Sequence, residues 1–468
     1  MNAPRYDAMV IGAGMSGLAA AVRLAQFDKR VVVLERHYLW GGLNSWYKRG
    51  GRRYDSGLHA LTNFVPRHVK AAPLPRLLRQ LRIGWDELEL GEQTHSEVRF
   101  PDLCLRFSNQ LGLFEEDVAA AFPRERDGFA RLIAAVRAAD PFDESAPPLL
   151  ARAELGRFLS DPLLVDALML PVCWYGSARE DDVDWYQFVI LFRSLFCEGF
   201  ARPRGGIKTV LDVLLRRLRE TGGELRTKSG VARILRDPCG AARGVVLDDG
   251  SEILSDCVLS SAGWPETMAL AGETVPPAER GHLSFVESVH VLDRRCDALG
   301  HDATITFFNT TDRFRWRRPD ALVDVESGVL CCTDNYACDP PMKEGLVRVT
   351  TLADHDRWCA LDEEAYDAAK VETCDRILDA MVPFGLDPRP HRVDGDMFTP
   401  RTIRQFTGRL GGAVYGSPRK RRDGSTGIPN LHLIGTDQGL VGVVGALLSG
   451  VTMVNRHALS TASATRSV

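Results

Sequence analysis

A glycine-rich turn near the N-terminus constrains the fold of this 468-residue chain more than any other feature. The turn covers residues 12–17, GAGMSG, and follows a short apolar segment at 6–11. An Ala/Leu-rich helical pattern at 18–27 and a β-branched segment at 31–34 come next. This order predicts a βαβ unit with a GxGxxG motif at its first turn, the arrangement that binds dinucleotides.

Each glycine of the motif has a physical role in such a unit. Gly12 permits the tight turn, Gly14 lets the backbone approach a pyrophosphate, and Gly17 allows the helix to pack closely on the sheet. Met15 and Ser16 lie at the start of the helix, where unpaired N–H groups and the helix dipole favour a phosphate. We therefore expect all five residues to contact a nucleotide.

An acidic residue ends the second predicted strand. Glu35 follows Gly12 by 23 positions (35 − 12 = 23), close to the spacing of about 20 typical of these units. A carboxylate there accepts hydrogen bonds from the adenosine ribose and repels a 2′-phosphate, which argues against NADP. The alternative is a glycine-rich loop with no nucleotide, and the ordered strand, helix, strand and glutamate disfavour it.

A second group of glycines follows the acidic residue. The sequence continues as Gly41-Gly42-Leu43-Asn44, then Gly50-Gly51, and then YDSGLH over residues 54–59. Together with GxGxxG and Glu35, this pattern resembles the FAD-dependent phytoene desaturase, carotenoid isomerase and retinol saturase family of the flavin amine-oxidase superfamily. Histidine at position 59 is more similar to the retinol saturase branch.

The resemblance implies FAD as cofactor and assigns roles along the chain. It places residues 55–59 near the flavin ring, the backbone of Val231 at the adenine, and Asp437 at the ribityl or pyrophosphate part. It also points the start of a helix at residue 442 toward the N1–C2=O edge of the flavin, where the helix dipole stabilises negative charge. The residues expected to contact FAD are Gly12, Gly14, Met15, Ser16, Gly17, Glu35, Arg36, Gly41, Gly42, Leu43, Asn44, Asp55, His59, Val231, Ala262, Gly435, Asp437, Gly442, Val443 and Val444.

The chain is too long for one ordinary core, so we expect two domains. The predicted fold class is α/β: a Rossmann-type, GR2-like FAD-binding domain with an inserted α+β substrate domain. The FAD-binding domain is discontinuous, over 1–70, 200–270 and 405–468, and the substrate domain covers 71–199 and 271–404. Residues 70–200 have a helix-like pattern, whereas strands are expected at 303–309, 328–333 and 346–352, and a long helix at 364–382. Residues 460–468 are expected to fray.

Composition limits the partners. The formal charge is −4, which gives no cationic field for nucleic acid. The eleven cysteines form no metal-binding pattern and suit reduced thiols in a cytosolic protein, so we expect no metal. Because no segment approaches the roughly 20 apolar residues of a membrane span, we expect a cytoplasmic protein, with peripheral contact at the inner face of the membrane left open. The basic, amphipathic stretch 76–85 is a candidate for that contact, and an ordinary surface helix is the alternative.

These features predict an FAD-dependent oxidoreductase that desaturates or saturates C–C bonds of a long apolar isoprenoid, in carotenoid metabolism, by hydride transfer to or from flavin N5. The alternatives are a redox-neutral carotenoid cis–trans isomerase, a flavin amine oxidase, and a non-enzymatic prenyl-lipid carrier similar to Rab GDP dissociation inhibitors. The intact glycine and acidic residues disfavour the carrier. The direction of reaction, the electron acceptor and the oligomeric state stay open.

His59 is the candidate acid–base residue, because its family position faces the ring and imidazole titrates near neutral pH. A structural histidine is the alternative. Asp184 and Glu198 flank the aromatic stretch 185–200 and are weaker candidates. That stretch is either a core helix or the wall of a hydrophobic substrate cavity.

Overall fold

The predicted βαβ unit is present in the computed structural model, which describes residues 4–143 and 147–460. Strands β2 (Ala8–Ile11) and β3 (Val31–Leu34) pair in parallel, and α1 (Met15–Ala25) connects them. They belong to a five-stranded sheet of order β10-β3-β2-β14-β20, whose neighbours all pair in parallel. Every residue of β2 and β3 is buried, as expected where layers cover both faces of a parallel sheet.

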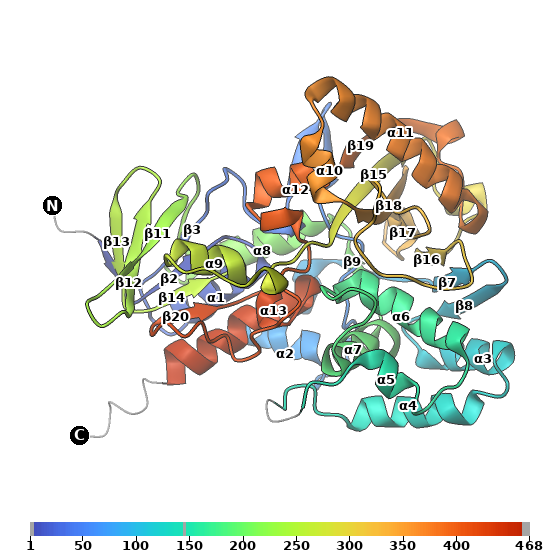
Figure 1. Ribbon diagram of the computed structural model, residues 1–468, viewed down its shortest axis with the longest axis horizontal. Helices are drawn as coiled ribbons and strands as arrows, with labels where there is room; N and C mark the ends of the chain where they lie inside the picture. The colour runs from blue at the N-terminus through green and yellow to red at the C-terminus, as the bar shows by residue number, and fades with distance from the viewer. Residues whose placement is uncertain (1–3, 144–146, 461–468) are drawn as a thin grey trace.

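The five-stranded sheet combines segments that are far apart in the sequence. β10 (Glu224–Arg226) and β14 (Val258–Ser260) come from the middle of the chain, and β20 (Leu431–Leu433) comes from its end. These strands fall in the three segments predicted for the FAD-binding domain, whose boundaries stay a prediction. In Figure 1 this sheet and the sheet built on β15–β18 lie toward opposite ends of the long axis.

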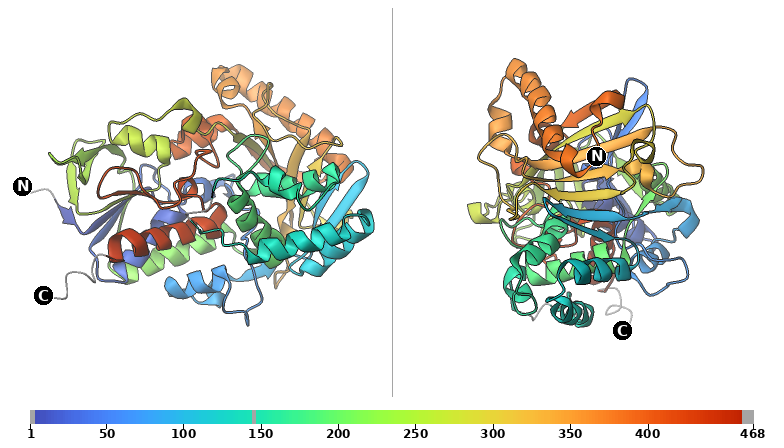
Figure 2. Two further views of the ribbon diagram at one scale, coloured as in Figure 1. Left: turned by 60° about the horizontal axis from the view of Figure 1, so that its bottom comes forward. Right: turned by 90° about the vertical axis from the view of Figure 1, so that its right-hand side faces the viewer.

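Layers cover both faces of the five-stranded sheet. On one face, α1, α2 (Pro73–Gln80), α8 (Ile207–Glu220) and α13 (Gly442–Val454) share one apolar core. α1 contacts both α8 and α13 in this layer, and the left view of Figure 2 shows α13, in red, passing beside the blue strands of the sheet. The other face packs on α9 (Trp264–Leu270) and on a four-stranded sheet of order β1-β13-β12-β11. Its strands are β1 (Arg5–Tyr6), β11 (Val231–Arg236), β12 (Ala242–Leu247) and β13 (Glu252–Ser255).

A second, mixed sheet of seven strands forms the other large unit, in the order β19-β15-β18-β17-β16-β7-β8. Its strands are β7 (Ser96–Phe100), β8 (Leu103–Phe107), β15 (Ser284–Leu292), β16 (Ile305–Asn309), β17 (Ser327–Cys332), β18 (Gly345–Ala353) and β19 (Arg392–Phe398). The strands expected at 303–309, 328–333 and 346–352 are confirmed as β16, β17 and β18. The long helix expected at 364–382 is confirmed as α11 (Glu363–Met381).

Helices cover the seven-stranded sheet on both sides. One core is formed with α3 (Leu111–Ala121), α4 (Arg126–Ala138), α5 (Ala151–Leu155), α6 (Pro162–Gly176) and α7 (Trp185–Phe192). The other core is formed with α10 (His355–Ala360) and α11. The remaining elements are the hairpin β4 (Trp46–Arg49) and β5 (Arg52–Asp55), the pair β6 (Leu90–Glu92) and β9 (Ala201–Pro203), and α12 (Pro400–Thr407).

The prediction of a helix-like region over 70–200 was wrong in part, because β6, β7 and β8 lie within it. In β7 and β8, buried residues alternate with more exposed ones, which is a strand pattern too short to stand out locally. The parallel partner of β7 is β16, about 200 positions later in the chain. Sequence reasoning also missed β15 and β19, which pair with each other at one side of this sheet.

Two stretches with open alternatives have a definite place in the fold. The leucines of the 76–85 stretch face inward, and Leu77 is fully buried in the core that this stretch shares with α1 and α13. The ordinary surface helix is therefore the structure found there. The aromatic stretch forms α7 and a π-helical turn at Arg193–Glu198, and its phenylalanines are core residues. Among the described residues, no helix has the length and apolarity needed to cross a membrane.

Helices α1 and α13 pack so closely that adding one methyl group between them should destabilise the protein. A Cβ added at Gly450 would overlap the Ser16 carbonyl oxygen and lie 3.0 Å from the Ala20 nitrogen. We expect Gly450→Ala to destabilise the protein by about 1–3 kcal/mol, as over-packing does elsewhere. Thermal unfolding measures the change. Gly112→Ala on α3 is the control, because no atom lies within 4 Å of its added Cβ, and an equal fall in Tm for both variants would contradict this packing.

Candidate functional site

The glycine turn leaves an open space at Gly14. Gly12 has a φ of +92°, and its N–H donates to the Leu34 carbonyl oxygen at 2.8 Å. A Cβ at Gly17 would overlap the Gly12 carbonyl group, so glycine is required there for packing. A Cβ at Gly14, by contrast, meets no atom within 4 Å. Gly14 is therefore the point where a ligand phosphate can approach the backbone at the start of α1.

The second pair of glycines packs against this turn. The Gly41 N–H donates to the Ala13 carbonyl oxygen at 2.9 Å, and Gly41 forms a parallel bridge with Gly14. Gly41 and Gly42 both have positive φ, and Gly42 begins a short 3-10 helix that includes Leu43 and ends at Asn44. The two glycine segments therefore form one cradle, as the sequence predicts for a dinucleotide.

Glu35 lies at one end of the cradle. Its carboxylate accepts hydrogen bonds from the Ala13 N–H at 2.8 Å and the His37 N–H at 2.9 Å. The Glu35 carbonyl oxygen accepts from Ser229 N–H, which brings the start of β11, with Val231, to the same place. Arg36 also lies here, because its Cγ is 3.1 Å from a Cβ built at Gly230. Glu35, Arg36 and Val231 are thus grouped where the resemblance places the adenosine.

The C-terminal segment reaches the glycine turn from the other side. β14 lies between β2 and β20, and pairs with both. Ala262 follows β14, and the adjacent Ser261 hydroxyl donates to the Ile11 carbonyl oxygen at 2.8 Å. Gly435 follows β20, and a Cβ there would lie 2.8 Å from the Ser16 Oγ. The carboxyl ends of three parallel strands meet here, which is where α/β sheets bind ligands.

The start of α13 is also open. Gly442 has a φ of +72°, and a Cβ added to it meets no atom within 4 Å. Val443 and Val444 are buried in the core shared with α1. The helix N-terminus therefore borders free space through Gly442, while the two valines hold the helix in place.

Asp437 is a fully buried anchor. Its carboxylate accepts from the Trp264 N–H at 2.6 Å and the Ser417 N–H at 2.7 Å, with Arg409 at 3.3 Å and Lys420 at 3.9 Å. Burial alone would raise the pKa of Asp437, but the Arg409 and Lys420 charges and these N–H groups lower it. Burial lowers the pKa of Lys420 to about 8. The structure thus gives Asp437 partners within the chain, and a contact with FAD stays a prediction.

Asp55 is anchored in a similar way. Its carboxylate accepts from Arg202 at 2.6 Å and from the Ile207 N–H at 3.2 Å. Arg202 also donates to the Leu58 carbonyl oxygen. This ion pair is almost completely buried, with 7% of each side chain exposed, so it fixes the path of residues 55–59.

His59 contacts the seven-stranded sheet. Its Nε2 lies 3.1 Å from the Thr350 hydroxyl on β18 and 3.5 Å from the Glu287 carboxylate on β15. Glu287 forms a buried ion pair with Arg348, which also donates to the Leu58 carbonyl oxygen at 3.4 Å. Burial alone would raise the pKa of Glu287, but the Arg348 charge and the His59 hydrogen bond lower it to about 2. His59 therefore faces an ionised carboxylate.

Sequence reasoning missed Glu287, Arg348 and Arg202. The available signal was weak: Glu287 and Arg348 are single charged residues in otherwise apolar strands, SFVESVHVL and GLVRVTTLA. A charge at such a position is paired when buried, but its partner is about 60 positions away in the sequence.

The two weaker candidates have local partners. Asp184 caps α7, because its carboxylate accepts from the Tyr186 and Gln187 N–H groups at 3.0 and 3.3 Å. This is a structural role, and it explains why an acidic residue precedes the aromatic helix. Glu198 accepts from the Asn63 side chain at 2.7 Å, and burial raises the pKa of its carboxyl group.

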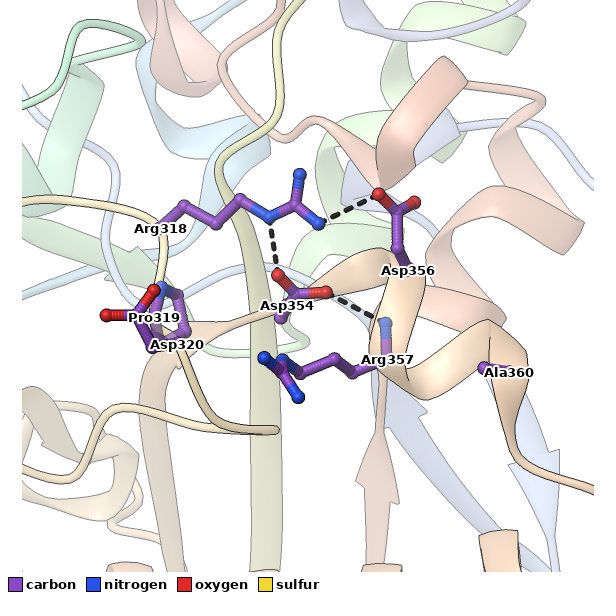
Figure 3. Close-up of a pocket in the computed structure, with 7 residues that line it drawn as sticks. All are labelled: Arg318, Pro319, Asp320, Asp354, Asp356, Arg357 and Ala360. Carbon is purple, nitrogen blue, oxygen red and sulfur yellow. Dashed lines mark hydrogen bonds and ion pairs between the residues drawn. The ribbon is translucent and has the colours of Figure 1, made fainter.

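A recess of about 550 Å³ opens on the surface of the molecule, away from the glycine cradle. Figure 3 shows it beside α10, with Arg318 between the carboxylates of Asp354 and Asp356. It includes none of the predicted site residues. Its lining is mostly charged, so we do not assign it to an apolar substrate.

The residues of the cradle fit FAD. A Cβ at Gly14 and a Cβ at Gly442 each meet open space, so the N-termini of α1 and α13 are both accessible to a ligand, and a helix N-terminus stabilises a pyrophosphate or the electron-rich edge of a flavin. Glu35 keeps acceptor capacity for ribose hydroxyls, because each of its carboxylate oxygens receives one hydrogen bond from the part of the chain that the structure describes.

Comparison with known proteins agrees with this geometry. Residues 15–456 match the family model described as flavin-containing amine oxidoreductase. The chain is 24% identical to a prolycopene isomerase of Arabidopsis thaliana, over 97% of this chain and 82% of that protein. It is 26% identical to the neurosporene-forming phytoene desaturase of Rhodobacter capsulatus, over 54% and 52%. A solved oxidoreductase from Methanosarcina mazei has the same fold, with a TM-score of 0.65, 19% identity and coverage of 96% and 99%.

The position of Glu35 predicts a specific loss of cofactor. We expect Glu35→Ala to lower FAD affinity by roughly tenfold or more, because a charge-assisted hydrogen bond to the ribose is lost. The ratio of flavin to protein after purification and the Kd for added FAD measure this. Glu252→Ala, at an exposed position on β13, is the control. Full flavin occupancy in the Glu35 variant would contradict the assignment.

The Glu287–Arg348 pair predicts a stability effect. Glu287→Leu leaves Arg348 buried without its carboxylate and should cost about 3–5 kcal/mol, whereas adding Arg348→Met should recover much of the loss. Because the pKa of Glu287 is about 2 in the folded state, its ionised form stabilises the fold above about pH 4.5 and this contribution is lost as the pH falls toward 2. Thermal unfolding measured against pH should show that loss of stability in the wild type and not in the Glu287→Leu/Arg348→Met double variant. If the wild type and Glu287→Leu were equally stable, the ion pair would not have the role assigned to it.

Proposed function

The chain belongs to the family of flavin-containing amine oxidoreductases, and from this premise we propose that it is an FAD-dependent oxidoreductase that desaturates or saturates C–C bonds of a long apolar isoprenoid of the carotenoid type. The observation that carries the proposal is the position of His59. Its segment leaves the glycine cradle and ends against the seven-stranded sheet, whose interior is rich in aromatic side chains. Relatives named as phytoene desaturase and prolycopene isomerase support the substrate class.

When bound, FAD supplies hydride acceptance or donation at N5. The protein's own residues do the rest. Arg202 and Arg348 both donate to the Leu58 carbonyl oxygen and fix the backbone that carries His59. The His59 Nε2 is directed to Thr350 and Glu287, so Nδ1 is the nitrogen that exchanges a proton with the substrate. Removing or adding a hydride at one carbon and a proton at the next gives balanced desaturation or saturation.

Redox-neutral cis–trans isomerisation is the second candidate. It is favoured by one specific observation, namely that the relative named prolycopene isomerase matches 97% of this chain and 82% of its own length. The same buried contacts of His59 serve this reaction, because they position a proton donor beside a polyene without requiring net electron transfer. A flavin amine oxidase is compatible with the family match as well.

We also propose that the protein takes its substrate from a membrane surface on the cytoplasmic side. Transfer of about thirty carbons through water would cost roughly 20 kcal/mol or more, at ~0.8 kcal/mol per CH2. The contact does not use the leucines of α2, which are buried. Vesicle binding in the presence and absence of the carotenoid would measure it directly.

Anaerobic mixing of the holoenzyme with phytoene, a carotene and a retinoid tests the reaction. We expect desaturation to bleach the long-wavelength flavin absorbance with one substrate, and product mass to fall by two hydrogens per bond. Saturation requires prior reduction of the flavin and raises the mass instead. Isomerisation changes retention without changing mass. Unchanged flavin absorbance and unchanged substrate throughout, in both flavin redox states, would refute the proposal.

The variant His59→Gln belongs in the same experiment. We expect a fall in the rate of roughly 100-fold or more with normal FAD content, because general acid–base catalysis contributes at least that much. A rate equal to that of the wild type would remove His59 from the mechanism.

A further inference from the structure

A cysteine, a histidine and an aspartate form a hydrogen-bonded chain on α10, outside the glycine cradle. The Cys359 Sγ lies 3.3 Å from the His355 Nε2, and the His355 Nδ1 lies 2.8 Å from the Asp356 carboxylate. The cysteine and the histidine are four positions apart, so they share one face of the helix. In the neutral ring, Nδ1 donates to the carboxylate, which leaves Nε2 free to accept the thiol proton. This is the order of a nucleophile, a base and a group that orients the base.

The fold holds the histidine of this chain in place. Asp354 is the N-cap of α10 and pairs with Arg318. The Asp356 carboxylate accepts from the Arg318 Nη2 at 2.8 Å, so one arginine fixes both carboxylates. The His355 side chain is 7% exposed, and its Cδ2 would lie 3.2 Å from a Cβ added at Gly412. The imidazole is therefore packed on one side and hydrogen-bonded on the other, with its Nε2 directed to the thiol.

The thiol borders the recess on this surface. Cys359 is a free, partly exposed cysteine. Asp356 and Ala360, three positions before it and one after it, both line the recess of about 550 Å³ (Figure 3). An α-helix turns by about 100° per residue, so position 359 lies about 60° from position 356 around the helix axis. The cysteine is therefore next to the face of α10 that lines the recess, and Asp356 belongs to both.

The recess carries charges of both signs that are not used within the chain. Arg318 binds the carboxylates of Asp354 and Asp356. By contrast, no ion pair joins Arg357 or Asp320, which also line the recess, to another described residue. A ligand that has both carboxylate and ammonium groups can pair with both of them. Short peptides have these groups, and isoprenoids do not.

We propose that Cys359 is a nucleophilic thiol that reacts with the disulfide of a low-molecular-weight peptide thiol and is converted to a mixed disulfide. This modification site goes beyond the proposed function and does not depend on it. His355 takes the Cys359 proton, and the thiolate forms an S–S bond with one sulfur of the small disulfide. The original S–S bond breaks, and the leaving thiolate takes the proton from His355. Cys359 is oxidised and the small disulfide is reduced to one thiol, so no other oxidant is needed.

The test uses oxidised glutathione as the probe on the holoenzyme, and peptide mass mapping measures the rate at which each cysteine gains one glutathionyl group. We expect Cys359 to react about tenfold or more faster than Cys239, which is more exposed but has no imidazole partner among the described residues. His355→Gln should slow the reaction of Cys359 by roughly tenfold or more, because the base is lost. Asp356→Asn should slow it as well, because the imidazole loses its carboxylate, and this variant serves if His355→Gln does not fold.

A second probe tests the recess. Hydroxyethyl disulfide is neutral, so it gains nothing from the charges at Arg357 and Asp320. At Cys359 we expect oxidised glutathione to react about threefold faster than hydroxyethyl disulfide, as exposed charge pairs allow, after correction for the ratio of the two rates at Cys239. Arg357→Ala should remove this preference and leave the reaction with hydroxyethyl disulfide unchanged.

The other results would contradict the inference. If Cys239 reacts as fast as Cys359, or if neither His355→Gln nor Asp356→Asn slows Cys359, the thiol is not activated and the inference is overturned. If the preference for oxidised glutathione is equal at both cysteines, the recess does not select a peptide disulfide and the proposed ligand class is wrong. None of these results bears on the proposed function, because the assay requires neither an isoprenoid nor turnover of the flavin.

Discussion

The pairing of β14 between β2 and β20 is the constraint on which the candidate site depends. These three strands come from positions 8–11, 258–260 and 431–433, and their parallel register brings their carboxyl ends to one edge. The glycine turn after β2, the segment after β14 and Gly435 after β20 meet only because of that register. Parallel strands separated by long connections are costly to bring together, so the apolar cores on both faces must stabilise the arrangement.

Segments near the cradle are held by buried ion pairs in addition to strand pairing. Asp55 with Arg202, Glu287 with Arg348, and Asp437 with Arg409 each join segments that are distant in the sequence. A buried charge that loses its partner is strongly destabilising, whereas the intact pair contributes little net stability. Such pairs therefore specify position more than they add stability, which suits segments that must present a backbone to a ligand.

Local signals explain what the sequence could predict. The βαβ unit and α11 follow from patterns within about thirty residues, and the family motifs located the glycine segments of the cradle. In contrast, β7 and β15 are recognised only through partners about 200 and 60 positions away, β16 and β18. The hydrogen bonds of Asp437 could not be predicted for the same reason. Its partners, the Trp264 and Ser417 N–H groups, lie outside the sequence motif that contains Asp437.

The charges around His59 also bear on the kind of substrate. A cationic amine in this interior would need an unpaired carboxylate, since an isolated charge is strongly disfavoured in apolar surroundings. Among the described residues, Glu287 beside His59 and Asp55 at the start of this segment are carboxylates that are each already paired with an arginine. This balance of charge favours a neutral, largely apolar substrate over an amine, and it follows from the pairing of the buried residues independently of the names of any relatives.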